Sequence, residues 1–213
     1  MCEELEIKIH NFGSLVEEGK ELKVKLPSPH RDSIYTICYT SGTTGDPKGV
    51  KLSHINLICP GSGLIKVNIP LYHSDVHLSY LPLAHVMERV VIVTLTGRGA
   101  KIGFYQGDVM KLKDDLAALK PTIFVSVPRL FNRFYDGMMA KINEQTGLKK
   151  KFASWAISRK LNNLQKSGNP TSNMLDKMVF NKFREAVGGN VRMMVTGSAP
   201  ISKDVINFLK IAF

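Results

Sequence analysis

The chain of 213 residues contains few cysteines and no long apolar segment. Its cysteines, Cys2, Cys38 and Cys59, are odd in number and form no C-x-x-C pair, which argues against a disulfide framework and a zinc knuckle and favours a reducing compartment. No apolar run approaches the ~20 residues that a membrane-spanning helix needs. Glutamates crowd the first six residues in place of a basic segment followed by an apolar one, so no signal peptide is visible.

The sequence also lacks internal repeats and low-complexity tracts, while one sign of charge is in excess. Lysine and arginine number 29 against 18 aspartate and glutamate residues, which gives a formal charge of +11. This surplus favours anionic partners such as nucleotides, CoA, anionic lipid or nucleic acid, but it does not choose among them. A solvated basic surface without any partner is the alternative.

Segments rich in β-branched and aromatic residues alternate along the chain with segments of helical periodicity. Strands are predicted at residues 34–39, 50–52, 76–81, 100–105, 122–127 and 191–196. Helices are predicted at residues 53–60, 85–96, 108–120, 148–166 and 172–187, from Pro128, and from Ser202 onward. The alternation predicts an α/β fold with a mostly parallel sheet covered by helices.

The two ends of the chain and its first strand give more specific expectations. Residues 1–32 are charged and weakly patterned, which predicts a linker-like start. The strand at 34–39 is expected to be buried, and Ser53 is expected to cap a helix that fades near Pro60. The last helix runs into Phe213 on apolar residues, so we expect the chain to be a piece of a longer protein.

The most informative stretch is a glycine- and hydroxyl-rich loop, Tyr39-Thr-Ser-Gly-Thr-Thr-Gly-Asp-Pro-Lys-Gly49. Its glycines let the backbone approach a bulky anion closely, and consecutive amides in such a loop form an anion-binding nest. Hydroxyl donors and the mobile charge of Lys48 complete a site suited to a polyphosphate. It is not a Walker A loop, because Pro47 precedes the lysine and Gly49 follows it. A flexible hairpin without a ligand is the alternative.

Three further patterns have more ordinary explanations. His73 and His77 are four residues apart, but on the strand predicted there they would lie ~13 Å apart, too far for one metal ion. Arg129 and Arg133 share one predicted helix face, which could meet phosphate but is more simply solvated. Trp155 is most simply an aromatic residue that packs its helix.

Together these residues resemble a known family, the adenylate-forming acyl-CoA synthetases, and within it the long-chain fatty acid–CoA ligases. The resemblance is carried, in order, by residues 40–54, 81–89, 121–133 and 192–202, and the segment 149–160 is similar to an insertion seen mainly in long-chain members. It implies that residues 1–213 form a partial N-terminal AMP-binding domain without the C-terminal cap domain.

The resemblance also implies roles for individual residues in a reaction of fatty carboxylate with ATP and then of CoA with the acyl-adenylate. Lys48 and His85 would be the catalytic residues, the first closing over the phosphates and the second lying where the acyl channel meets the adenylate. The β- and γ-phosphates would be held by Thr40, Ser41, Gly42, Thr43, Thr44 and Gly45. The adenine and the acyl-adenylate would be bordered by Gly197, Ser198, Ala199 and Pro200. The ordinary alternatives are a solvated lysine, a packed histidine and a plain strand–helix turn.

The implied cofactors and partners are ATP, Mg²⁺, CoA and a fatty acid, with peripheral membrane association and no nucleic acid. The implied location is the cytoplasm or the cytoplasmic face of an intracellular membrane such as the endoplasmic reticulum. We find no Tyr-Gly-x-Thr-Glu block, whose glutamate would hold Mg²⁺, and expect it beyond the C-terminal end; turnover by these 213 residues alone is therefore not expected. The competing hypotheses are a non-catalytic nucleotide- or acyl-binding remnant and a basic membrane- or nucleic-acid-binding module.

Overall fold

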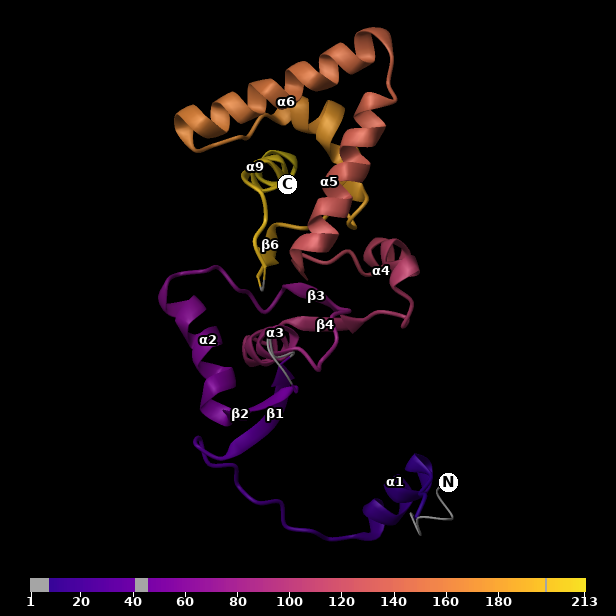
Figure 1. Ribbon diagram of the computed structural model, residues 1–213, viewed down its shortest axis with the longest axis vertical. Coiled ribbons are helices and arrows are strands. Elements are labelled where there is room, and N and C mark those ends of the chain that lie inside the picture. The colour runs from indigo at the N-terminus through magenta and orange to yellow at the C-terminus, as the bar shows by residue number, and fades with distance from the viewer. Residues whose placement is uncertain (1–7, 41–45, 198) are drawn as a thin grey trace.

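The computed structural model describes residues 8–40, 46–197 and 199–213 and has a parallel sheet at its centre (Figure 1). The strand order is β4-β3-β5-β6, with β3 (Val76–Ser79), β4 (Lys101–Phe104), β5 (Ile123–Ser126) and β6 (Met193–Thr196). Every pairing in this sheet is parallel. The connections between successive strands are helical, through α3 (Val86–Gly97), then η1 (Val109–Lys111) with α4 (Leu112–Leu119), then α5 (Pro128–Asn143) and the helices after it. The predicted α/β fold with a helix-covered parallel sheet is confirmed.

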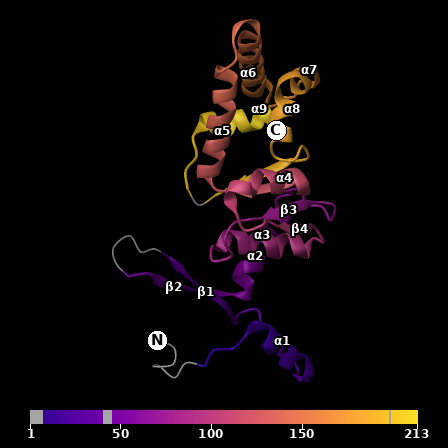
Figure 2. The same cartoon turned by 90° about the vertical axis from the view of Figure 1, so that its right-hand side faces the viewer.

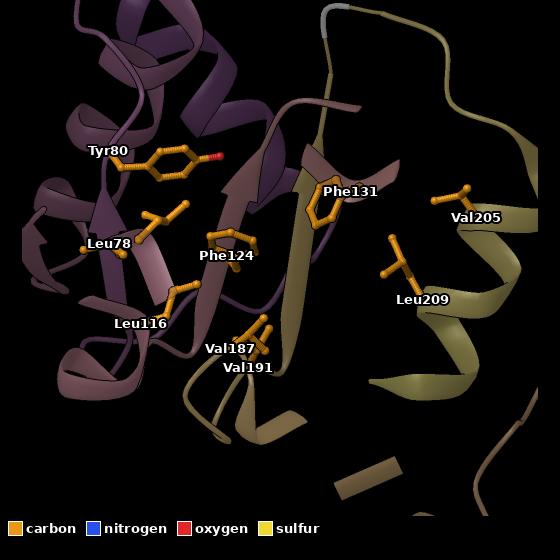
Figure 3. Packing of buried hydrophobic residues seen from close by; sticks show 10 residues of the cluster. Leu78, Tyr80, Leu116, Phe124, Phe131, Val187, Val191, Val205 and Leu209 are labelled. Carbon is orange, nitrogen blue, oxygen red and sulfur yellow. The ribbon is translucent and has the colours of Figure 1, made fainter. Parts of the chain in front are cut away.

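The core lies where β5 is covered on both faces. Every residue of β5 is buried, as expected for a central parallel strand that helices cover on both sides. Phe124 is 0% exposed and packs edge-on against Phe131 of α5, with ring centroids 5.8 Å apart. Leu78 of β3 and Leu116 of α4 complete this part of the cluster, which Figure 3 shows from close by. Apolar burial therefore fixes the sheet and the helices around it.

The first two strands form a separate antiparallel hairpin, β1 (Ile34–Thr40) and β2 (Lys48–Ser53). Figure 2 shows it projecting from the body of the molecule. The prediction that residues 34–39 form a strand is confirmed, but the prediction that this strand is buried is wrong. Its partner is β2 and not the parallel sheet, so only Cys38 of β1 is buried.

Helix boundaries differ from expectation at three places. The start expected to be linker-like contains α1 (Phe12–Glu21), whose first amides are bonded by the side chain of Asn11. Ser53 caps α2 (His54–Lys66) as predicted, but the helix continues through Pro60 instead of fading there. The predicted helix 172–187 is broken into α7 (Asn173–Leu175), the π-turn η2 (Asp176–Phe180) and α8 (Asn181–Glu185).

The turn that ends this helical segment requires glycine. Gly188 has a φ of +92°, and a Cβ there would lie 2.4 Å from the carbonyl oxygen of Leu116. The turn leads into β6, after which α9 (Lys203–Ala212) begins, with Ser202 bonding the amide of Val205. With α6 (Gly147–Ser167), α9 forms the end of the molecule far from the hairpin (Figure 1).

Candidate functional site

The hairpin places two of the predicted site residues opposite each other. Thr40 ends β1 and Lys48 begins β2, and the two are paired across the ladder, with the Thr40 hydroxyl 3.5 Å from the Lys48 carbonyl oxygen. Both side chains are exposed. The predicted phosphate-binding residues Ser41, Gly42, Thr43, Thr44 and Gly45 lie outside the described residues. Thr40 and Lys48 therefore stand at the two ends of the segment that carries the predicted loop.

Gly49 of the same motif packs closely across the hairpin. A Cβ at this position would lie 2.9 Å from Cγ2 of Ile37 and 3.5 Å from the ring of Tyr39. A larger residue would require the Ile37 side chain to shift. This glycine thus has a packing role in addition to any role toward a ligand.

His85 lies where the chain leaves the carboxyl end of β3 and enters α3. It is the N-cap residue of α3, its amide donates to the Pro82 carbonyl oxygen at 3.0 Å, and it is exposed. It is therefore not the packed core histidine that was the alternative. An exposed imidazole at a helix N-terminus next to a sheet edge is available to a ligand.

Arg89 links the hairpin to this segment, and sequence reasoning did not single it out. Its guanidinium donates to Thr36 Oγ1, to the carbonyl oxygen of Leu83, and to Cys38 Sγ at 3.5 Å. Cys38 Sγ in turn lies 3.9 Å from the carbonyl oxygen of Ala84, next to His85. The strand that leads into the glycine-rich loop is thus fastened to the residues around His85. The only sequence signal for this role was the presence of Arg89 in the block 81–89.

The turn after β6 reaches the same place. A Cβ at Gly197 would lie 3.5 Å from Sδ of Met87, which is in the first turn of α3. Ala199 and Pro200 are exposed, and Ser198 lies outside the described residues. The structure thus brings the base of the hairpin, His85 and Gly197 together at the carboxyl ends of the parallel strands.

This edge contains the point at which the strand order reverses. The chain passes from β3 outward to β4 and then back to β5 on the other side of β3. In open α/β sheets, ligands bind in the crevice outside the carboxyl ends of the strands at such a switch point. Two side chains are joined by a buried hydrogen bond of 2.7 Å beside this point: Tyr80, directly after β3, and Ser126, the last residue of β5. Burial raises the pKa of Tyr80 to about 12, so the phenol stays protonated and donates to Ser126.

The two histidines that lie four residues apart in the sequence, His73 and His77, do not form one site. His73 is exposed, whereas His77 is fully buried in β3 with its Nε2 3.0 Å from Oε1 of Glu88 on α3. Within the described ranges, no group of three or more His, Cys, Asp or Glu side chains is placed to hold a metal ion. We therefore assign no step to Mg²⁺ on these residues.

An ion pair between the partly exposed Arg192 and the buried Asp75 lies at the amino ends of the parallel strands. Arg192, which precedes β6, donates to both carboxylate oxygens of Asp75, which precedes β3. Burial opposes ionisation of Asp75, but hydrogen bonds from Arg192, Tyr72 and Thr122 outweigh it and lower its pKa below the ordinary value. This pair fixes strands across the sheet, far from the ends where the candidate site lies.

The two arginines of α5 are both exposed, in agreement with the simpler interpretation of a solvated helix face. Trp155 is 51% exposed and stacks only partly on Phe152, with ring centroids 5.7 Å apart. The interpretation of Trp155 as a residue that packs its helix is therefore only partly right.

Comparison with known proteins agrees with this arrangement. The model of the AMP-binding enzyme family matches residues 4–213. The chain is 44% identical over 207 residues to the peroxisomal long chain acyl-CoA synthetase 6 of Arabidopsis thaliana, covering 97% of this chain and 29% of that protein. It is 44% identical over 209 residues to the long-chain-fatty-acid–CoA ligase 5 of Rattus norvegicus, covering 97% of this chain and 30% of the relative.

Solved structures show the same fold at lower identity. The adenylation domain of a carboxylate reductase from Mycobacterium chelonae superposes with a TM-score of 0.70 at 21% identity, over 94% of this chain and 28% of that one. The didomain of a carboxylic acid reductase from Segniliparus rugosus, solved in complex with AMP, gives a TM-score of 0.64 at 24% identity, over 94% and 26% of the two chains.

The chain thus spans about 30% of the length of the curated relatives. The family match extends over nearly all of its residues, and it includes each block that carried the resemblance in the sequence. The chain therefore belongs to the AMP-binding enzyme family and groups there with the long-chain acyl-CoA synthetases.

Proposed function

We propose that this chain is part of the large domain of a long-chain fatty acid–CoA ligase, which activates a fatty acid with ATP to an acyl-adenylate and then transfers the acyl group to CoA. The observation that carries the proposal is the convergence of the hairpin base, His85 and Gly197 at one edge of a parallel sheet. Family membership supports it, because relatives at 44% identity are named as such synthetases.

In this proposal the loop residues Thr40 to Gly45 hold the β- and γ-phosphates and Lys48 closes over them. Negative charge develops on phosphate oxygens when the fatty carboxylate attacks the α-phosphate and pyrophosphate leaves, so fixed donors and a cation there stabilise the transition state. The exposed side chain of Lys48, at the first residue of β2, supports this role. Its partner across the ladder, Thr40, contributes a hydroxyl.

His85 and the turn 197–200 occupy the other side of the proposed site. His85, at the N-terminus of α3, would border the acyl carboxylate, and Gly197, Ser198, Ala199 and Pro200 would border the adenine. The short distance from Gly197 to Met87, two residues after His85, supports placing the two groups in one site. Mg²⁺ would supply charge neutralisation of the phosphates, and we place its ligand outside these residues.

The location of the whole ligase is a further part of the proposal. No helix within the described ranges is long and apolar enough to cross a membrane. We propose peripheral association with the cytoplasmic face of an intracellular membrane, such as that of the endoplasmic reticulum, although two relatives are named as peroxisomal.

The test is fatty-acid-dependent exchange of pyrophosphate into ATP, measured on a full-length protein that contains this chain. We expect exchange with palmitate, little with acetate, and a loss of at least about tenfold in Lys48→Ala, because a charge-assisted contact to phosphate is removed. Equal exchange with acetate would contradict the long-chain assignment. Nucleotide binding without any exchange would instead favour a non-catalytic remnant.

A further inference from the structure

The helical end of the molecule has a large excess of positive charge, and the proposed reaction gives these residues no role. Between residues 145 and 184 the basic residues are Lys149, Lys150, Lys151, Arg159, Lys160, Lys166, Lys177, Lys182 and Arg184, and the sole acidic residue is Asp176. Elsewhere the chain mixes both signs, so much of the excess positive charge is concentrated here.

The one carboxylate of this segment is neutralised inside the protein. Asp176 is paired with the buried ammonium of Lys160 and, at 3.3 Å, with Arg184. Burial lowers the pKa of Lys160, and its hydrogen bond to Asp176 acts in the opposite direction. Among the described residues no ion pair involves the remaining lysines and Arg159, so their charge faces outward.

The outer side of α6 arranges these cations together with apolar side chains. At 3.6 residues per turn, six exposed positions fall within about 80° of one another around the helix. They are Leu148, Lys151, Trp155, Arg159, Asn162 and Lys166, which we call the outer stripe. Leu148 is 84% exposed and Trp155 is 51% exposed. The opposite side, with Ala153 and Ala156, packs toward the rest of the protein.

A groove next to the start of α6 also combines apolar side chains with cations. It has a volume of about 870 Å³, and its apolar lining residues include Phe152, Met178 and Phe183. Its charged lining residues in the described chain are all basic: Lys113, Arg133, Lys141, Lys149 and Lys182. A surface that alternates apolar groups with cations, and has no competing anions, complements an anionic amphiphile.

We propose that the outer stripe of α6 binds the surface of an anionic phospholipid bilayer. Leu148 and Trp155 enter the headgroup region, where tryptophan is favoured, and Lys151, Arg159 and Lys166 contact lipid phosphates and carboxylates with their apolar stems directed inward. Each such cation adds favourable energy near an anionic membrane, and salt screens it within a Debye length. Only two apolar side chains insert, so binding is reversible and depends on anionic lipid.

The position of α6 is compatible with simultaneous nucleotide binding. Both views place α6 at the end of the molecule opposite the hairpin (Figures 1 and 2). Contact between the outer stripe and a membrane therefore leaves Thr40 and Lys48 of the hairpin uncovered. The inference does not depend on the proposed ligase activity, since it rests on the surface of α6 and the groove beside it.

Trp155 makes a direct test feasible because it is the only tryptophan of the chain. The full chain would be mixed with phosphatidylcholine vesicles with and without phosphatidylserine, and binding would be measured by cosedimentation. We expect binding only to the vesicles with phosphatidylserine, together with a blue shift of Trp155 emission and its quenching by brominated lipid. Added salt should release the protein.

A triple variant Lys151→Glu, Arg159→Glu, Lys166→Glu should reduce vesicle partitioning by at least about tenfold. The matched control, Lys8→Glu, Lys23→Glu, Lys25→Glu, makes the same change in net charge at exposed positions near the N-terminus and should bind nearly as well as the unmodified chain. The quenching of Trp155 in the unmodified protein tests the same contact without any substitution.

Three results would overturn the inference. The first is equal partitioning of the triple variant and its matched control. The second is vesicle binding without any change in Trp155 emission. The third is tighter binding of a single-stranded RNA oligonucleotide than of phosphatidylserine vesicles at the same salt concentration, which would make the outer stripe a nucleic-acid surface.

Discussion

The parallel sheet and the β1–β2 hairpin are both built from short strands, but they are held in place by different forces. Phe124 of the sheet is 0% exposed, whereas Tyr39 of the hairpin is 72% exposed. Apolar burial on both faces fixes the sheet. The hairpin depends on its own ladder and on the polar contacts of Arg89. The sheet beside the candidate site is therefore fixed by buried apolar packing. The hairpin, which carries the glycine-rich loop, is attached to it by a few polar contacts.

The largest effect should follow from emptying the core of the sheet. Phe124→Ala removes a ring that contacts Phe131 and Tyr80, and the loss of burial plus the remaining cavity should lower the free energy of unfolding by about 3–5 kcal/mol. Urea denaturation followed by circular dichroism measures it. A loss below about 1 kcal/mol would show that the sheet is not the rigid part of the molecule.

The next effect should come from the ion pair across the sheet. Asp75→Asn leaves Arg192 without its charged partner, and since Arg192 is partly exposed we expect a loss of about 2 kcal/mol at neutral pH. Asp75 has a pKa below its ordinary value of 3.8, so its contribution is present above that pH and is lost as the pH falls through the folded-state pKa. Denaturation curves of the two proteins should therefore converge in acid. A constant difference down to the lowest pH would contradict this explanation.

A smaller and more local effect is expected at the link between the two regions. Arg89→Met removes the hydrogen bonds to Thr36 and Leu83 and should cost about 1–2 kcal/mol of stability. Hydrogen exchange of the β1 and β2 amides should become about tenfold faster, while β5 amides should change little. Arg98→Met is the matched control, because Arg98 lies at the end of the same helix and bonds to Leu71. Equal acceleration in both variants would remove the special role of Arg89.

The smallest effect is expected on the hairpin surface. Tyr39→Ala should change the free energy of unfolding by less than about 0.5 kcal/mol, because this side chain is largely in solvent already. The same urea titration as for Phe124→Ala measures it. A loss comparable to that of Phe124→Ala would erase the distinction between the regions.

Much of the sheet could be predicted from sequence because local signals mark its strands. Pro82, Pro121 and Pro128 bound apolar segments, and the alternation of strands with helices then leaves a parallel sheet as the natural topology. The exposure of β1 could not be predicted this way. An apolar segment indicates a strand, but the identity of its partner is a tertiary property.

The candidate site was also predictable only in part. The strand–loop–strand order around Thr40 and Lys48 was predicted, since the motif is contiguous in sequence, but its pairing as a separate hairpin was not. The bond from Arg89 to Thr36 joins residues 53 positions apart, and that from Arg192 to Asp75 joins residues 117 positions apart. No spacing rule within one segment reveals such pairs. The same holds for the burial of His77 against Glu88, which only the packing of α3 on β3 defines.

The central claim is that the hairpin presents its loop and Lys48 to the triphosphate of ATP. Calorimetric titration of the full-length protein with ATP and with AMP tests it most directly. Lys51→Ala is the control, since Lys51 is exposed on the same strand but points to the other face. We predict that Lys48→Ala weakens ATP binding by at least about tenfold while AMP affinity stays within about twofold, and that Lys51→Ala changes neither. Unchanged ATP affinity in Lys48→Ala, or an equal loss for ATP and AMP, would contradict the account.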